Sequence, residues 1–381
     1  MSPITHVAFL MPSAGWGGIE RKNVHFANEL ARRGIRVDML LSRSETPPYQ
    51  DYLNESVHVR PLGARHKYSA VPKVKAYLDS EQPDVLITAK DHGAKVGIVA
   101  GRLSRAHTKI VLGIGNTLGT SETKLGRRLG VRLLYRLADR IIANSQGVAD
   151  DLVESFGLPG KKVRVVFNPV VTDNLLDRCR EPVDHPWLQG GRDFTTVLGC
   201  GRLSPQKDFP TLLRALAEVR MHRDCRLVVL GEGPERGNLR ALAERLGITD
   251  AVDFPGFVDN SYAYMARTDL FVLSSRWEGL PNVLIEALAC GAPCVATDCP
   301  SGPREILREG QYGRLVPMGD AQEMATAIGE GLDSPTPPAI LREAADRFKA
   351  EAATDHLLEV LGEVAAPASP ATVSSRTSAD E

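Results

Sequence analysis

Two glutamates eight positions apart mark the stretch of this sequence with the clearest chemical content. Residues 274–293 read S-S-R-W-E-G-L-P-N-V-L-I-E-A-L-A-C-G-A-P. Glu278 follows the apolar run 270–273, which predicts a strand, and Glu286 lies in a predicted helix. Pro281 suits the first helical position because its φ angle is fixed and it has no amide hydrogen to leave unbonded. The pattern predicts a strand–loop–helix unit with Glu278 at its mouth and Glu286 about one and a half turns up the helix.

A helix that starts at this loop would direct its free backbone amides into the same space. The residues concerned are Gly279, Leu280, Asn282 and Val283. Amides at a helix N-terminus bind phosphate, and carboxylates accept hydrogen bonds from hydroxyl groups. A sugar nucleotide carries both kinds of group, so it is the ligand that we expect here. The alternative is that both glutamates are solvated charges or capping groups.

Two cations stand five residues apart at the start of a second predicted unit. Arg202 and Lys207 lie in G-C-G-R-L-S-P-Q-K-D-F, between a strand and a helix. A planar guanidinium and a mobile ammonium in such a loop suit a diphosphate. A helix N-terminus contributes only about 0.3–2 kcal/mol to binding an anion, so a departing diphosphate needs cations as well. No cluster of residues has the spacing of a metal site, and we expect these cations to replace a metal ion. The alternative is two surface charges.

Glycine-rich turns follow two further predicted strands. Gly15, Gly17 and Gly18 open the first helix, where the missing side chains let backbone amides approach a phosphate closely. The pattern is neither the G-x-G-x-x-G fingerprint nor a P-loop. Glu232 and Gly233 lie in the other turn, which either contacts the base of a nucleotide or is a plain connection.

Two more segments hold candidate residues. In D-C-P-S-G-P-R-E-I-L, Ser301 and Gly302 offer amides to a ligand, while Arg304 and Glu305 are expected to pair on a short helix. His92, in the predicted loop A-K-D-H-G-A-K, either faces the acceptor side of a cleft or is an ordinary surface residue.

The charges divide the chain into a basic and an acidic half. Residues 1–170 hold 25 Lys and Arg against 15 Asp and Glu, whereas the remainder holds 21 against 32. A cationic stripe accounts for part of the excess, with four-residue spacing at Lys124, Arg128, Arg132, Arg136 and Arg140. Such a helix, with leucines on another face, suits an anionic membrane surface. The alternative is a solvated helix with core leucines. Nucleic acid is a poorer partner because no aromatic residues are interleaved.

The composition is that of an ordinary cytosolic globular protein. The chain has 381 residues, of which 43% are hydrophobic and 24% charged, enough for two domains. Six cysteines show no C-x-x-C pair, which favours a reducing compartment over a disulfide framework or zinc site. The apolar start at 7–11 is too short for a signal-peptide core, and no run approaches membrane-spanning length.

Strands and helices are predicted to alternate nearly throughout, which indicates two doubly wound parallel sheets. The predicted strands are 6–11, 35–41, 84–88, 109–113, 140–143, 163–166, 194–199, 225–230, 251–254, 269–273, 293–297 and 312–316. The predicted helices are 18–33, 70–80, 93–104, 124–138, 146–155, 208–221, 234–246, 281–289, 320–332 and 340–362.

This alternation predicts two Rossmann-like domains that face an interdomain cleft. The expected limits are 1–170 for an acceptor-side domain, 171–192 for a linker, 193–345 for a nucleotide-sugar domain, 346–364 for a C-terminal helix and 365–381 for a disordered tail. Ligands of such sheets bind outside the carboxyl ends of the strands. The candidate donor-binding loops follow predicted strands, so we expect the donor to bind in this cleft.

Together these residues resemble the retaining glycosyltransferases of family four, which have the GT-B fold. The motifs that carry the resemblance are G-G-I-E-R at 17–21, G-R-L-S-P-Q-K at 201–207, G-E-G-P at 231–234 and E-G-L-P-N-V-L-I-E at 278–286. The resemblance implies that Arg202 and Lys207 hold the donor diphosphate and act in catalysis with Glu278, which contacts the sugar. It further implies that Glu286 binds the ribose and that Gly18 lets the first domain close on the diphosphate.

The loop at 298–307 is similar to that of bacterial members that build lipid-linked oligosaccharides, O-antigens or capsules, several of which use UDP-N-acetylhexosamines. Many members carry a histidine after the strand matching 109–113. Here Gly115 or Asn116 takes that place, so the first-domain side chain that supports the anomeric centre stays open.

The resemblance implies a retaining, metal-independent transferase that moves a hexose or N-acetylhexosamine from a UDP-sugar without a cofactor. The expected acceptor is a polyprenyl-diphosphate-linked glycan, reached from the inner face of the membrane. Two other functions stay open: a sugar-nucleotide 2-epimerase of the same fold, and a sugar-nucleotide-binding protein without turnover.

Overall fold

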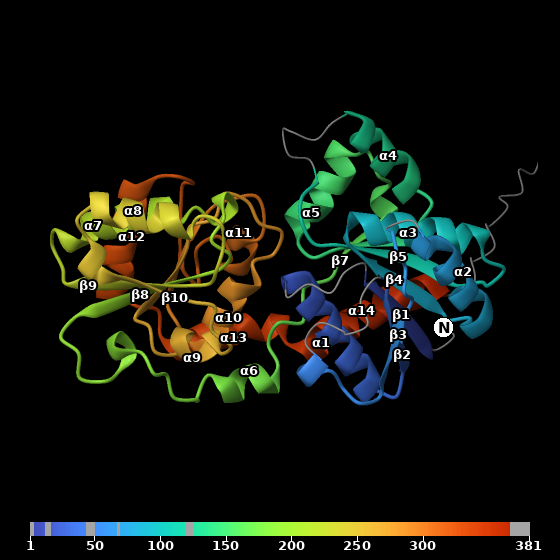
Figure 1. The fold of residues 1–381 in the computed structure, drawn as a ribbon, viewed down its shortest axis with the longest axis horizontal. Coiled ribbons are helices and arrows are strands. Elements are labelled where there is room, and N and C mark those ends of the chain that lie inside the picture. The colour runs from blue at the N-terminus through green and yellow to red at the C-terminus, as the bar shows by residue number, and fades with distance from the viewer. Residues whose placement is uncertain (1–3, 12–16, 43–49, 67–68, 119–124, 366–381) are drawn as a thin grey trace, which may run out of the picture.

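The chain forms two domains, each built on one parallel sheet (Figure 1). The structure is a computed structural model that describes residues 4–11, 17–42, 50–66, 69–118 and 125–365. The first sheet has seven strands in the order β3-β2-β1-β4-β5-β6-β7, and the second has six in the order β10-β9-β8-β11-β12-β13. Every strand pairing is parallel. The predicted fold of two doubly wound sheets is confirmed.

The strands are β1 (His6–Met11), β2 (Arg36–Leu41), β3 (Val57–Pro61), β4 (Val85–Ala89), β5 (Lys109–Ile114), β6 (Arg140–Ala143), β7 (Val163–Val165), β8 (Thr195–Cys200), β9 (Cys225–Leu230), β10 (Val252–Gly256), β11 (Leu270–Leu273), β12 (Cys294–Thr297) and β13 (Arg314–Val316). The α-helices are α1 (Gly18–Arg32), α2 (Ala70–Glu81), α3 (Lys90–Leu103), α4 (Leu125–Tyr135), α5 (Gln146–Asp150), α6 (Asp173–Arg178), α7 (Phe209–Arg220), α8 (Arg236–Arg245), α9 (Ser261–Met265), α10 (Asn282–Cys290), α11 (Pro303–Ile306), α12 (Ala321–Asp333), α13 (Pro338–Ala345) and α14 (Ala350–Ala365). The central strands β1, β4 and β11 are buried along their whole length, as continuous apolar runs predict for strands covered on both faces.

Several predictions of secondary structure were wrong or incomplete. The edge strand β3 was missed because only its first residue, Val57, is buried and the run lacks an apolar core. The single helix predicted at 340–362 is two helices, α13 and α14, separated by a 3₁₀ turn at Asp346–Phe348. Arg140 was placed on the cationic helix stripe, yet it begins strand β6.

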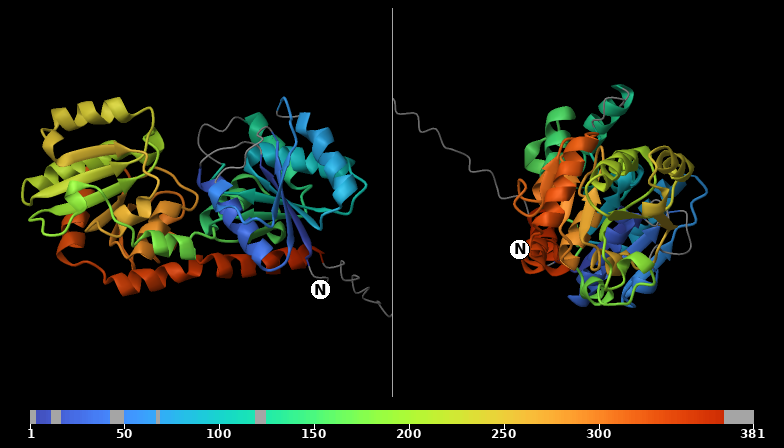
Figure 2. Two further views of the ribbon diagram at one scale, coloured as in Figure 1. Left: turned by 60° about the horizontal axis from the view of Figure 1, so that its bottom comes forward. Right: turned by 90° about the vertical axis from the view of Figure 1, so that its left-hand side faces the viewer.

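Helix α14 returns the chain to the first domain (Figure 2). Its residues Ala353, Leu357, Val360 and Leu361 belong to the core that β1 and α1 also share. The chain crosses between domains twice at one place, where the amides of Val170 and Val171 both donate to the Phe348 carbonyl oxygen at 3.0 Å. Two adjacent connections therefore join the domains, while the exact domain limits stay a prediction.

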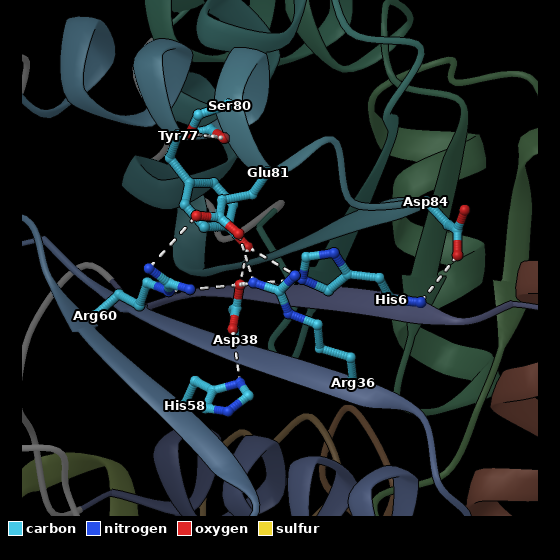
Figure 3. A network of polar contacts seen from close by, with 9 residues as sticks. All are labelled: His6, Arg36, Asp38, His58, Arg60, Tyr77, Ser80, Glu81 and Asp84. Carbon is cyan, nitrogen blue, oxygen red and sulfur yellow. Dashed lines mark hydrogen bonds and ion pairs between the residues drawn. The ribbon is translucent and has the colours of Figure 1, made fainter.

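A charged network lies at the amino end of the first sheet, opposite the edge where parallel sheets bind ligands (Figure 3). Asp38 is fully buried and accepts hydrogen bonds from Tyr77 at 2.6 Å and from His6 at 3.0 Å. Burial would raise the pKa of Asp38, but these hydrogen bonds and the charges of Arg36 and Arg60 outweigh it and hold the pKa well below its usual range. This network therefore stabilises the fold with Asp38 ionised.

Candidate functional site

The predicted cation Lys207 and the predicted carboxylate of Glu278 are in direct contact. The Lys207 ammonium donates to Glu278 Oε1 at 2.6 Å, and the Ser275 hydroxyl donates to the same oxygen at 2.7 Å. Glu278 is 7% exposed, so both its position and its rotamer are fixed by these bonds. Its second oxygen, Oε2, has no hydrogen bond from the described residues. Glu278 therefore offers one free acceptor next to a held ammonium.

Glu286 lies one turn inside helix α10 and is almost completely buried, at 1% exposed. Burial raises the pKa of Glu286, while the charges of Arg21 and Lys207 lower it. The Arg21 guanidinium, which comes from α1 of the first domain, makes an ion pair with Glu286. It also donates to the Tyr262 hydroxyl at 2.9 Å. The second carboxylate of the predicted site is thus held by a cation from the other domain.

Helix α10 begins one residue later than the sequence predicts. Pro281 is the N-cap residue, with an extended ψ of 98°, and Asn282 is the first helical residue. Asn282 Oδ1 accepts a hydrogen bond from Asn168 at 2.7 Å, and a Cβ added to Gly18 would lie 3.3 Å from Asn282 Nδ2. The start of α10 therefore faces Gly18 and the connection between the domains, and its first amides point toward that junction.

The first domain meets the loop after β11 at Gly279. A Cβ added to Gly279 would lie 1.9 Å from the Gly115 carbonyl oxygen and 3.1 Å from the Cα of Asn116. Any side chain at 279 would push the domains apart. The segment 115–116 after β5 thus lies directly against the predicted sugar loop, and Asn116 is exposed there, while its acceptor-side role stays a prediction.

A second contact joins the domains beside the first. The hydroxyls of Ser145 and Ser301 lie 3.1 Å apart, and the Gln146 amide donates to both carboxylate oxygens of Glu305 at 3.2 and 3.0 Å. The predicted pairing of Arg304 with Glu305 is wrong, because Arg304 pairs with Asp298 and Glu309 instead. Glu305 therefore serves the contact between domains.

The remaining donor-side candidates lie around this core. Arg202 is exposed and makes no ion pair or hydrogen bond with the residues that the structure describes. Glu232 pairs with Arg236 on the surface, and a Cβ added to Gly233 would lie 2.2 Å from the Leu203 carbonyl oxygen. Gly233 is therefore required for the close packing of two loops. Gly17 is the N-cap of α1, Val283 is half-buried in the first turn of α10, and Leu280 is buried.

In the first domain one sequence-based placement needs correction, and one residue was missed. His92 lies in the first turn of α3 rather than in a loop, and it is half-buried. Arg21 was not singled out, although it reaches the most buried carboxylate of the site. The motif G-G-I-E-R contained it, but nothing in the sequence tells which face of the helix meets the second domain.

The cationic helix α4 and the residues just after it carry three leucines on the surface. Leu129, Leu133 and Leu137 are 55%, 59% and 43% exposed, while Val131 and Tyr135 form the buried face. These three leucines do not belong to the core, whereas Leu134 of the same helix packs against it.

The arginines of the stripe lie next to the following loop. Arg128 and Arg136 donate to the carbonyl oxygens of Ser155 and Gly157 at 2.9 and 2.7 Å, and Arg132 lies beside Gly157. Lys124 lies outside the described residues. Arg140 instead pairs with Glu363 of α14 at 3.2 Å.

Two further observations concern ligands. Among residues 4–11, 17–42, 50–66, 69–118 and 125–365, no group of three His, Cys, Asp or Glu side chains is placed to hold a metal ion.

A cavity of about 580 Å³ lies behind α1, lined by His25, Tyr52, Asp173 and Lys349 among others. It contains none of the predicted donor residues, so the side of α1 where Arg21 meets Glu286 is the better candidate site.

Both halves of the chain match glycosyltransferase families. Residues 16–174 match the family described as Glycosyltransferase Family 4, and residues 195–334 match Glycosyl transferases group 1. The lipopolysaccharide core biosynthesis glycosyltransferase LpsE of Rhizobium meliloti is 30% identical over 354 residues, or 91% of this chain and 96% of the relative.

A second relative is more similar over a shorter stretch. The N-acetylgalactosamine-N,N'-diacetylbacillosaminyl-diphospho-undecaprenol 4-alpha-N-acetylgalactosaminyltransferase of Campylobacter jejuni is 36% identical over 194 residues, or 51% of each chain.

Solved structures show the same architecture. The lipopolysaccharide outer core galactosyltransferase WaaB superposes with a TM-score of 0.75 over 94% of this chain and 99% of its own, at 20% identity. Anabaena HepE in complex with UDP superposes with a TM-score of 0.77 over 94% of this chain and 100% of its own, at 23% identity. This chain is therefore a glycosyltransferase that belongs to family 4 and has the GT-B fold.

Proposed function

We propose that this protein transfers a hexose or N-acetylhexosamine from a UDP-sugar to a glycan acceptor with retention of configuration, in the synthesis of a cell-surface polysaccharide. The observation that carries the proposal is the cluster of Lys207, Glu278 and Glu286 beneath the first domain. The two buried carboxylates can accept hydrogen bonds from hydroxyl groups, and the Lys207 ammonium lies near a helix N-terminus that can bind phosphate. A nucleoside diphosphate sugar carries both kinds of group.

Each side chain then has one task. Glu286 accepts hydrogen bonds from the ribose hydroxyls, and Glu278 contacts the sugar through its free Oε2. Lys207 and the exposed Arg202 neutralise the diphosphate as the bond to the sugar breaks. The acceptor oxygen attacks from the face that the diphosphate leaves, and a phosphate oxygen takes the acceptor's proton. No protein base, metal ion or cofactor is required, and the protein supplies orientation and charge stabilisation.

The test is a set of thermal unfolding measurements with nucleoside diphosphates and UDP-sugars in the presence of EDTA. A donor at 100-fold over its Kd adds about 2.7 kcal/mol to the stability of the folded protein. We expect UDP and one UDP-sugar to raise the unfolding midpoint, and we expect Glu286→Ala to abolish the rise. If no nucleotide shifts the wild-type midpoint, the proposed function is wrong.

Product analysis then separates the alternatives. A 2-epimerase would convert the donor without an acceptor, and a binding protein would bind UDP-sugar without any product. The transferase alone yields a glycosidic product with the donor's anomeric configuration, which NMR of the product detects.

We further propose a polyprenyl-diphosphate-linked acceptor that approaches from the cytoplasmic face of a membrane. The support is a set of exposed apolar residues on two helices that pack together: Val99 and Leu103 of α3, Leu129 and Leu133 of α4, and Leu137 just after α4, with arginines between them in the sequence. Apolar side chains of this kind insert at the boundary between headgroups and acyl chains, and the flanking cations favour anionic lipids. No helix within the described residues is long and apolar enough to cross a membrane.

A further inference from the structure

Helix α1 contains a buried lysine that has no partner. Lys22 is 8% exposed, and within the described part of the chain its ammonium joins no ion pair and donates no hydrogen bond. Burial lowers the pKa of Lys22 to about 8. Lysines are rarely buried without a counter-charge, because an ammonium loses its hydration there. A buried ammonium without a counter-charge is a candidate for contact with a ligand.

The sequence makes room for this ammonium. Lys22 Nζ lies 3.7 Å from the position that a Cβ on Gly113 would occupy, near the carboxyl end of β5. Two residues on, a Cβ on Gly115 would lie 3.6 Å from Ile19, which precedes Lys22 on the same helix. Because residues 113 and 115 have no side chains, Lys22 Nζ and Ile19 of α1 lie against the backbone of β5.

This end of β5 adjoins the candidate site. Gly115 is the residue whose carbonyl oxygen would lie 1.9 Å from a Cβ on Gly279, in the predicted sugar loop. Two residues along a strand span about 7 Å, which places the Lys22 ammonium close behind that contact. Helical side chains also lean toward the N-terminus of their helix, so the ammonium is displaced from the Lys22 Cα toward the glycine turn that opens the cleft.

Asn144, the residue after β6, has a side-chain oxygen without a hydrogen-bond partner in the described part of the chain. Its amide nitrogen donates to the Gly115 carbonyl oxygen at 3.1 Å, whereas its oxygen Oδ1 is buried and accepts nothing. The Lys22 ammonium at Gly113 and the Asn144 amide at Gly115 thus lie two residues apart along the end of β5. Unsatisfied polar groups of this kind are rare in folded proteins and cost stability.

We propose that Lys22 binds a phosphate oxygen of a substrate in the cleft and that Asn144 Oδ1 accepts a hydrogen bond from a neighbouring sugar hydroxyl. This rests on the proposed function, whose substrates carry diphosphates. The phosphate belongs either to the UDP-sugar donor or to the diphosphate of the lipid-linked acceptor.

The test replaces Lys22 with methionine, which keeps the length of the side chain and removes its charge. We expect Lys22→Met to unfold at the same temperature as the wild type or higher, and to lose between about 10- and 100-fold in kcat/KM, the effect of one charged hydrogen bond. Lys109→Met is the matched control, because Lys109 stands at the opposite, amino end of β5. It should retain wild-type kinetics.

Titration with UDP in the absence of acceptor identifies the phosphate. A Kd for UDP raised about tenfold or more assigns Lys22 to the donor, and an unchanged Kd with a raised KM for the lipid-linked acceptor assigns it to the acceptor. Kinetics within about twofold of the wild type, or a lowered unfolding temperature, would overturn the inference. A wild-type protein that binds no UDP would instead overturn the proposed function itself.

Discussion

Arg21 and Glu286 form an ion pair between the two domains although 265 positions separate them in the sequence. The Glu286 side chain is 2% exposed and that of Arg21 is 22% exposed, so water screens the pair weakly. Glu286 is also the residue proposed to bind the ribose. The pair therefore couples the contact between the domains to the residue that would bind the nucleotide.

Arg21 and Glu286 should be coupled in the free energy of unfolding. Removing one partner of a buried pair costs about 3–5 kcal/mol, and the exposed part of Arg21 reduces this, so we expect Arg21→Met to lose about 2–4 kcal/mol in urea unfolding. The double variant Arg21→Met/Glu286→Gln should recover part of that loss, with a coupling energy of about 1–3 kcal/mol. Additive losses would mean that the two side chains act independently.

The same variant should change the pH dependence of UDP binding. Arg21 opposes the effect of burial, which raises the pKa of Glu286. Without Arg21 that pKa rises further, so Glu286 takes up its proton at a higher pH. We expect the UDP affinity of Arg21→Met to fall at a higher pH than that of the wild type, as measured by calorimetric titration between about pH 5 and 8. Superimposable pH profiles would contradict this.

Lys207 should matter for chemistry more than for stability. Its ammonium is held by Glu278 at 2.6 Å, ready to meet the diphosphate. We expect Lys207→Met to lower kcat by about 10²–10³-fold, in the range of a lost electrostatic group. Lys161→Met, an exposed lysine of the first domain, is the control and should retain activity. Full turnover by Lys207→Met would remove Lys207 from the diphosphate site.

The site residues that the sequence placed near each other follow the ends of neighbouring parallel strands. Lys207 follows β8 and Glu278 follows β11, and these strands are neighbours in the sheet. Because carboxyl ends of parallel strands meet at one edge, residues 71 apart came together as the sequence predicted. The predicted helix start at 281 was wrong by one residue, because Pro281 caps the helix and Asn282 is its first residue.

The sequence did not predict which faces of the helices are buried. Helix α1 was predicted from its pattern, yet its length and charges do not tell that Arg21 meets the second domain or that Lys22 is buried on the sheet. In α4 an alternation of leucine and arginine fits either a core face or a surface. Only the packing against α3 decides that Val131 and Tyr135 are inside and the leucines outside.

Removing the buried charge of Lys22 should stabilise the folded protein by an amount that depends on pH. In the unfolded chain its pKa is near 10.5, and in the folded protein it is about 8. Below pH 8 both states carry the charge and the folded state bears the full cost, on the order of 3 kcal/mol. Lys22→Met should therefore be more stable than the wild type at pH 7, and the difference should shrink as the pH rises from about 8 to 10.5. Urea unfolding at several pH values measures this, and a constant difference would contradict it.

The Asp38 network predicts loss of stability in acid. Its pKa is held below the usual value, so the stabilisation is complete above about pH 4 and is lost as the pH falls toward the folded-state pKa. We expect Asp38→Asn to lose about 2–4 kcal/mol at pH 7 and to show a shallower decline in acid. Asp177→Asn, which breaks an exposed pair with Arg180, should lose less than about 1 kcal/mol. Equal losses in the two variants would show that burial of Asp38 is unimportant.

The exposed strip of α4 predicts a membrane contact that can be separated from folding. Leu129, Leu133 and Leu137 lie at the surface, so replacing all three with glutamine should leave the unfolding midpoint nearly unchanged. Binding to vesicles of anionic lipid should fall by at least about tenfold, since inserting each leucine contributes about 1.5–3 kcal/mol.

The control for this experiment is the triple variant of Met221, Phe257 and Met318, three exposed apolar residues of the second domain. Its glutamine substitutions should leave vesicle binding intact. Activity on a water-soluble acceptor should stay constant in both variants, because α4 lies apart from the carboxylates, whereas activity on a lipid-linked acceptor should fall only in the leucine variant. If the leucine variant sediments with vesicles as the wild type does, this surface does not contact the membrane.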